Sequence, residues 1–130
     1  MGLYMIEKLF AVSLAGVLAL AGTASAHHSG AMYDSSKKDT LRGVVTDFEW
    51  TNPHAWLQVE VVDPASKKTA RWVFESLGTN QLTRAGWTRN SIKPGDQAVV
   101  VYNPLHDGDP GGRLVSVSVN GKPVGGEDHE

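Results

Sequence analysis

The fold is decided by residues 69–103, which read TARWVFESLGTNQLTRAGWTRNSIKPGDQAVVVYN. The first part, Thr69–Glu75, alternates apolar and polar side chains, which is the pattern of a half-buried strand. Thr79–Ala85 loses this alternation and begins with residues suited to cap a helix, while Gly86 suits its C-terminal end. Gln97–Asn103 is a nearly continuous apolar run, which indicates a central strand. The stretch therefore predicts a short helix between two strands.

Three further strands are predicted around this segment, at Leu41–Trp50, Ala55–Val62 and Arg113–Val119. The pair Asn52-Pro53 separates the first two, because proline cannot donate a hydrogen bond to a strand ladder. Five strands with one short helix between the third and the fourth is the element order of an OB-fold, a small and partly open barrel. The competing architecture is a small β-sandwich, which would not need the helix. We expect an all-β, OB-like barrel.

The N-terminus has the three parts of a secretory signal in their usual order. Lys8 precedes the apolar run Leu9–Ala21, which is too short to cross a hydrocarbon core of about 30 Å as a helix. Ala24-Ser25-Ala26 then supplies the pattern of small residues at a cleavage site. We expect cleavage after Ala26, with Ala24 as the alternative, and export to the periplasm without a membrane anchor.

Composition limits the classes of function. The chain contains no cysteine, which excludes disulfides, thiolate metal sites and cysteine nucleophiles. Lys+Arg 12 against Asp+Glu 14 gives a formal net charge of -2, so there is no basic excess to bind nucleic acid or anionic lipid. The predicted segments are a signal peptide over residues 1–26, a flexible N-terminal arm over 27–39, the barrel over 40–120 and a disordered tail over 121–130.

The histidines are the most informative candidates for a site. Because no cysteine is present, a tight transition-metal site must use nitrogen and oxygen donors. A terminal amine with nearby imidazoles forms a planar, nitrogen-rich chelate, which suits Cu(II) or Ni(II). We predict a copper site formed by the amine and ring of His27 together with His54, with His28 and His106 as alternates.

The predicted barrel supports this site, because His54 lies in the loop between the first two strands and His106 in the loop between the last two. These two loops flank the usual binding face of an OB-fold. Cleavage after Ala24 would instead make His27 the third residue, and the amine, the amides and its imidazole could then wrap Cu(II) without any fold. The opposing interpretation is that the loop histidines are simply solvated and that His54 orients the Asn-Pro turn.

A second candidate site is formed by Trp50, Asn52 and Trp56, which surround the Asn-Pro-His turn. An exposed indole there would offer a platform for a saccharide, another small molecule or a partner protein, although nothing indicates the identity of a protein partner. Trp72 and Trp87 are predicted to be core residues. Packing is the alternative for the first two tryptophans as well, because aromatic residues more often pack than bind.

Other chemistry has less support in the sequence. Asp107-Gly108-Asp109 resembles the start of a calcium loop, but it lacks the third oxygen position and the distal glutamate. Ser29 lies beside His28 without an acid to orient the ring. The sequence therefore does not support an enzyme, and activity would require a bound copper ion that is redox-active.

Five motifs carry a family resemblance: Ala26-His27-His28-Ser29, WTNPHAW at 50–56, RAGWTR at 84–89, KPGD at 93–96 and DGDPGG at 107–112. In this order they resemble a family of small exported bacterial proteins, number six-one-five-two among the domains of unknown function. The resemblance implies a periplasmic, β-rich protein without an assigned activity, and it places His27, His28 and His54 in family motifs. The terminal histidine alone also resembles the copper-binding N-terminus of periplasmic copper carriers and polysaccharide monooxygenases.

Two functions follow from different classes. The first is an exported copper-binding module that uses the mature N-terminal histidine and the Asn-Pro-His loop. The second is a metal-free, OB-like barrel that binds a small molecule, a saccharide or a partner protein through the face between Trp50 and Trp56. One residue added before His27 would abolish the first function and leave the second intact.

Overall fold

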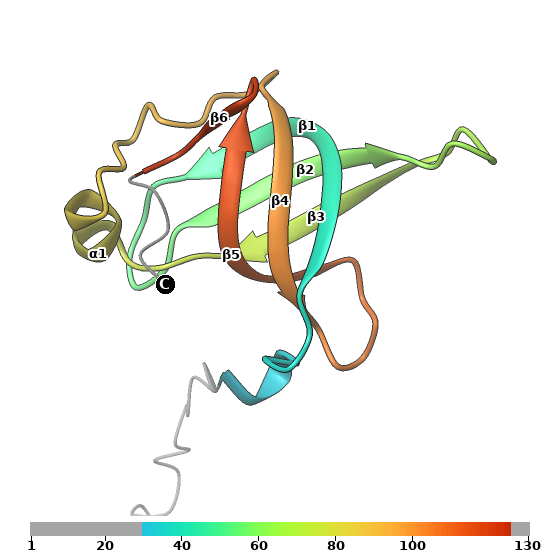
Figure 1. Ribbon diagram of the computed structural model, residues 1–130, viewed down its shortest axis with the longest axis horizontal. Helices are drawn as coiled ribbons and strands as arrows, with labels where there is room; N and C mark the ends of the chain where they lie inside the picture. Colours follow the sequence, from blue (N-terminus) through green and yellow to red (C-terminus); the bar gives the residue numbers. More distant parts are fainter. Residues whose placement is uncertain (1–29, 126–130) are drawn as a thin grey trace, which may run out of the picture.

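Five strands form where the sequence predicts them, with one helix between the third and the fourth, and a short sixth strand follows. The computed structural model describes residues 30–125. The elements are a 3-10 turn (Gly30–Met32), β1 (Asp39–Glu49), β2 (Trp56–Val62), β3 (Thr69–Glu75), α1 (Thr79–Arg84), β4 (Gln97–Pro104), β5 (Gly111–Val119) and β6 (Lys122–Pro123) (Figure 1). Within the described range, no helix is both long and apolar enough to span a membrane.

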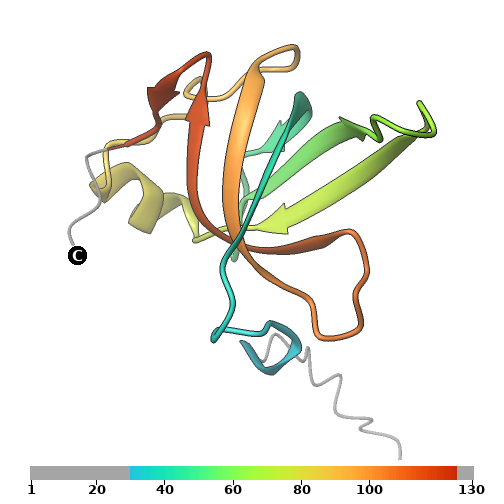
Figure 2. The ribbon, with the colours of Figure 1, turned by 45° about the vertical axis from the view of Figure 1, so that its right-hand side comes forward.

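The sheet closes on itself into a barrel. Its strand order is β3-β2-β1-β4-β5-β6 with antiparallel neighbours, and β3 also pairs in parallel with β5. This parallel contact runs from the pair Val73 and Gly111 to the pair Glu75 and Arg113. In Figure 2, β4 and β5 lie side by side and β6 folds back along the end of β5. The predicted all-β, OB-like barrel with one helix between the third and fourth strands is confirmed.

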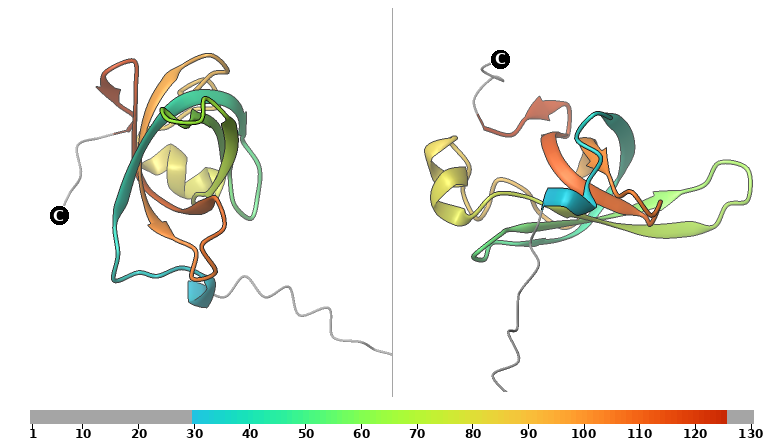
Figure 3. Two further views of the ribbon diagram at one scale, coloured as in Figure 1. Left: turned by 90° about the vertical axis from the view of Figure 1, so that its right-hand side faces the viewer. Right: turned by 90° about the horizontal axis from the view of Figure 1, so that it is seen from below.

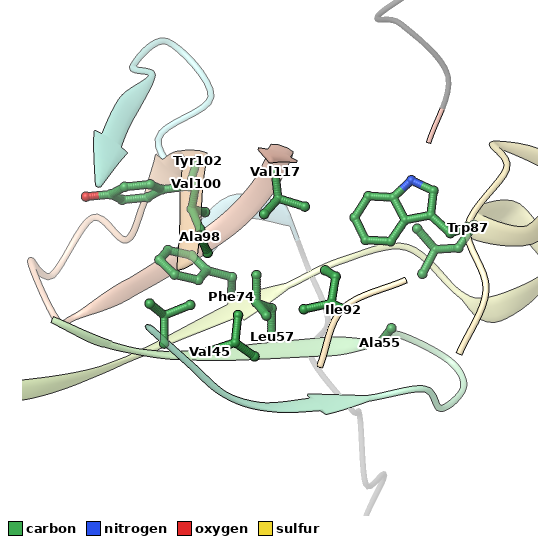
Figure 4. Packing of buried hydrophobic residues seen from close by; sticks show 12 residues of the cluster. Val45, Ala55, Leu57, Phe74, Trp87, Ile92, Ala98, Val100, Tyr102 and Val117 are labelled. Atoms are coloured by element: carbon green, nitrogen blue, oxygen red, sulfur yellow. The ribbon is translucent and has the colours of Figure 1, made fainter. Parts of the chain in front are cut away.

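The core lies inside the barrel and is closed at one end by the helix segment. Its fully buried side chains come from four strands, as Figure 4 shows, and the largest of them are Val45, Leu57, Val59, Phe74 and Val100. The helix and the residues after it add Leu82 and Trp87, which are also buried. The prediction that Trp87 is a core residue is confirmed, whereas Trp72 is only partly buried and packs against the core beside Phe74, with ring centroids 6.2 Å apart.

Two register shifts decide which side chains of β1 and β5 face inward. In β1, Val45 is buried and Val44 is exposed. The pairing of β1 with β2 shifts register between Val45 and Asp47, and an extra residue in one strand reverses the alternation beyond it. A second shift occurs in the pairing of β4 with β5, and Val115 is exposed while Val117 is buried.

The predicted flexible arm, residues 27–39, is wrong for the part that the structure describes. Tyr33 is buried and forms an isolated β-bridge with Leu105, and the amide of Asp34 donates to the carbonyl of Pro104 at 2.8 Å. Figure 3 shows the Gly30–Met32 turn against the loop that joins β4 to β5. Residues 30–39 lie against the barrel because they contribute an aromatic side chain and two strand-like contacts to it.

The predicted disordered tail, residues 121–130, is wrong for residues 121–125. Lys122–Pro123 pairs with β5, and the amide of Val124 donates to the carbonyl of Val117 at 3.0 Å. The turn before β6 is Asn120-Gly121, with φ of 50 and 81. Asn-Gly is the preferred pair of a two-residue hairpin whose central residues both have positive φ. Asn120-Gly121 is therefore a local hairpin signal in the sequence, at the start of the predicted tail.

Gly111→Ala tests the closure of the barrel. A Cβ on Gly111 would overlap the carbonyl oxygen of Val73, in the pairing that joins β5 to β3. We expect the variant to lose about 1–3 kcal/mol of unfolding free energy in urea denaturation, the usual effect of overpacking. The control is Gly30→Ala, where the nearest atom to the new Cβ is Nη1 of Arg113 at 3.6 Å. Equal stability of the two variants would contradict the observed closure.

Candidate functional site

A pocket of about 540 Å³ lies on the outer face of β2 and β3, between the arm and the loop that joins β4 to β5. Side chains that point inward from these strands, such as Leu57 and Phe74, belong to the core, so their neighbours in the sequence face the pocket. Its apolar lining consists of Met32, Tyr33, Trp56, Val73, Leu105 and Pro110. The same strand face and the loops beside it form the usual ligand surface of an OB-fold.

A buried carboxylate, Glu75, forms part of the wall of this pocket. One of its oxygens accepts a hydrogen bond from the hydroxyl of Tyr33. The other lies 2.7 Å from Nδ1 of His54. We call Tyr33, Glu75 and His54 the Glu75 cluster. It joins the N-terminal arm, the end of β3 and the loop between β1 and β2.

The register of the β2–β3 hairpin explains why these groups meet. Trp56 pairs with Glu75, and the amide of Ser76 donates to the carbonyl of Ala55 at 2.8 Å. The ladder therefore continues past the ends of both strands and brings the backbone of residue 54 beside that of residue 76 and beyond. His54 and Glu75 are held close together by this ladder, and Trp56 shares the pocket face with Glu75.

The electrostatics of the cluster keep Tyr33 protonated. Burial raises the pKa of the Tyr33 phenol, and the hydrogen bond to Glu75 and the charge of Glu75 raise it further, while Arg113 opposes them. The phenol is therefore a permanent donor to the carboxylate near neutral pH. Because a carboxylate oxygen only accepts hydrogen bonds, its 2.7 Å contact with Nδ1 is favourable when that nitrogen carries a proton.

The structure describes two of the four predicted metal ligands, His54 and His106. His54 belongs to the Glu75 cluster and is about one-third exposed. His106 is exposed in the loop between β4 and β5, where its amide donates to the carbonyl of Met32 at 3.0 Å. His27 and His28 lie outside the described residues. Among residues 30–125, no three His, Cys, Asp or Glu side chains gather into a group that could hold a metal ion.

The three predicted ligand-binding residues around the Asn-Pro-His turn do not share one face. Trp56 lines the pocket. Trp50 packs against the core and makes an edge-on contact with Phe48, with ring centroids 6.0 Å apart. The side-chain oxygen of Asn52 accepts hydrogen bonds from the amide and the hydroxyl of Thr79, each at 3.0 Å. Asn52 therefore holds the start of α1, and Trp56 alone of the three contributes to this pocket.

Sequence reasoning missed the central role of Glu75. The alternation in β3 did place Arg71 and Glu75 on the face opposite Trp72 and Phe74, but it gave no reason to expect burial of a carboxylate. A hairpin register derived from the turn after β2 would have put Glu75 opposite Trp56 and beside His54. Nothing in the sequence pattern indicates the contact with Tyr33, because 42 positions separate Tyr33 from Glu75.

Tyr33→Phe tests the Glu75 cluster. Removing the hydroxyl takes a donor from a buried carboxylate, and we expect a loss of roughly 1.5–3 kcal/mol of unfolding free energy in urea denaturation.

Tyr33 also sets an upper pH limit to part of the protein's stability. The phenol of Tyr33 ionises at about pH 10 in the unfolded chain and only above that pH in the folded protein. Its contribution to the unfolding free energy is therefore complete below about pH 10 and is lost as the pH rises further.

The ionisation of the Tyr33 phenol is measured as the difference in tyrosinate absorbance between the natural protein and the Tyr33→Phe variant. The difference should stay near zero through pH 10 and appear only at higher pH or with unfolding. A rise centred at about pH 10 in protein that is still folded would show that the Tyr33 phenol is not held by Glu75.

Comparison with known proteins agrees with the motifs noted in the sequence. No curated protein matches the chain. Residues 14–114 match the profile of the family of unknown function DUF6152. This match includes β1 to β4, the Asn-Pro-His loop and the start of β5. The resemblance inferred from the five motifs is therefore confirmed, and the chain belongs to the family of unknown function DUF6152.

Proposed function

We propose that this protein is an exported, periplasmic copper-binding module. Its ligands are the terminal amine and ring of His27, exposed by cleavage after Ala26, and the ring of His54. The observation that carries the proposal is the contact of 2.7 Å between Nδ1 of His54 and the buried carboxylate of Glu75. Histidines that bind metals commonly have a carboxylate beside their second ring nitrogen.

The contact with Glu75 prepares His54 for a metal in two respects. It places the proton on Nδ1, so that Nε2 is the nitrogen with the lone pair when the ring is neutral. A carboxylate partner also limits rotation of the ring. Glu75 itself is held by the Tyr33 hydroxyl, so the orientation of His54 depends on the arm.

The docked arm supports the participation of His27. Tyr33 is held by Leu105 and Glu75, and a Cβ at Gly30 would lie 3.6 Å from Nη1 of Arg113, a residue that pairs with Glu75. Three residues of extended chain span at most about 10 Å, so an N-terminus at His27 begins within that distance of Gly30. His28 and His106 are the alternate ligands.

The donor set suits copper in its oxidised state. A primary amine and imidazoles without thiolates favour Cu(II) among the divalent ions of the first transition series. Bound copper would supply a one-electron redox centre, and the protein's own residues supply nitrogen donors and the carboxylate that orients one of them. Uptake should weaken at low pH, because only neutral imidazole binds a metal.

The test is a calorimetric Cu(II) titration of protein processed by its own host, with the N-terminal mass verified. Two variants are compared with it: one with an extra alanine before His27, and His54→Ala. We expect tight one-to-one binding that is lost in both, by at least roughly a hundredfold, because each removes a ligand or moves the terminal amine. His28→Ala and His106→Ala report the alternate ligands, and His129→Ala is the control.

Two outcomes would contradict this proposal. Loss of binding only in the extended protein would mean a terminal chelate that does not use the barrel. Binding no tighter than roughly micromolar in the processed protein would exclude a physiological copper site. The second outcome would favour the metal-free binding module and direct attention to the pocket lined by Trp56.

A further inference from the structure

We propose that the pocket on the outer face of β2 and β3 binds an organic cation, an ammonium group carried on an apolar body. This pocket shares Glu75 with the proposed copper site, but binding there does not require a bound metal. The pocket volume of about 540 Å³ lies within the range of about 300–1,000 Å³ that is usual for small-molecule sites. Three features of the pocket support this ligand: the apolar side chains, the aromatic rings and the charged side chains of its lining.

The walls suit an apolar body. Met32, Val73, Leu105 and Pro110 come from three segments, the N-terminal turn, β3 and the loop between β4 and β5, and line one space. Burying apolar surface of a ligand against them gives a favourable, non-directional contribution to binding. An ion without an apolar part, such as a metal ion or inorganic phosphate, would leave these side chains unused.

Two aromatic rings and a carboxylate suit a positive charge on that body. Trp56 and Tyr33 both line the pocket, and the face of an indole or phenol ring attracts a cation. Glu75 lines the same space and accepts from Tyr33 with one oxygen, while the other oxygen contacts His54. A carboxylate has about four lone-pair positions, so a ligand N–H or O–H has an acceptor there.

The balance of charge in the lining also favours a cation. Two carboxylates, Glu75 and Asp109, line the pocket together with one guanidinium, Arg71, while the charge of Arg113 acts on Tyr33 from outside the lining. Nη2 of Arg71 already donates to the side-chain oxygen of Gln58, which directs part of this group toward the strand surface. An anionic ligand would meet both carboxylates, and a saccharide would leave much of its polar rim against apolar side chains.

The experiment compares two ligands of the same shape in NMR titrations of metal-free protein. Choline carries a quaternary ammonium, and 3,3-dimethylbutan-1-ol has a carbon atom in place of the nitrogen. We expect choline to bind at least roughly threefold more tightly, with shifts at Trp56, and to lose affinity as salt is added. Because the protein is freed of metal beforehand, the result does not depend on whether the copper proposal holds.

Two variants that change the charge of the lining in opposite directions test the electrostatic part of the proposal. Asp109→Asn should weaken choline binding by roughly threefold or more, whereas Arg71→Gln should strengthen it, because each removes one charge from the lining. Trp56→Leu should weaken it by roughly tenfold. Lys93→Gln is the control, because Lys93 lines a different pocket, beside β6. Asp109 and Arg71 are exposed, so their variants report on charge even if Trp56→Leu does not fold.

Several results would overturn the proposal. Equal binding of the neutral alcohol would show that the pocket selects shape rather than charge. The same direction of change in Asp109→Asn and Arg71→Gln would exclude an electrostatic role for the lining. The absence of shifts at saturating choline would exclude an ammonium ligand of this size at Trp56.

Discussion

Burial of the Glu75 carboxylate is the constraint on which the candidate sites depend. A carboxylate removed from water is costly unless hydrogen-bond donors or a positive charge compensate it. Here the compensation comes from Tyr33 in the arm and from His54 after β1, two segments that are distant from β3 in the sequence. The requirement therefore fixes the arm on the barrel, orients the imidazole and shapes one wall of the pocket.

The barrel itself could be predicted because its signals are local. The alternation in β3 defined that strand to the residue, and the loss of alternation after Gly78 located α1 to within one residue. The inward faces of β1 and β5 were less predictable, because a bulge depends on how a strand meets its neighbour. The hairpin at Asn120-Gly121 is also encoded locally, by a residue pair that favours two positive φ angles.

The candidate site was less predictable for the same physical reason. His54 could be recognised because its residue type and its loop position are both visible in the sequence. The partner of His54 could not, because Glu75 acquires its role only when the hairpin register and the docked arm are known. Asn52 shows the reverse: a residue chosen for its place between two tryptophans instead holds the first turn of α1.

The two proposed sites meet at Glu75. In the copper proposal its carboxylate orients His54, and in the pocket proposal the same group faces an ammonium ligand. A ligand that binds the Glu75 carboxylate from the pocket side would compete with His54 for it. Such a ligand would therefore change the donor strength of His54. Glu75 would in this way couple metal binding at the proposed copper site to ligand binding in the pocket.

The most direct measurement of this account is the tautomer of His54 in long-range proton–nitrogen NMR spectra, recorded where the ring is neutral. We predict that the proton is on Nδ1 and that Nε2 is unprotonated, because only a protonated Nδ1 is stable 2.7 Å from Glu75. In Glu75→Gln this preference should weaken. A neutral ring with its proton on Nε2 would contradict the account, since Nδ1 and the carboxylate would then repel each other.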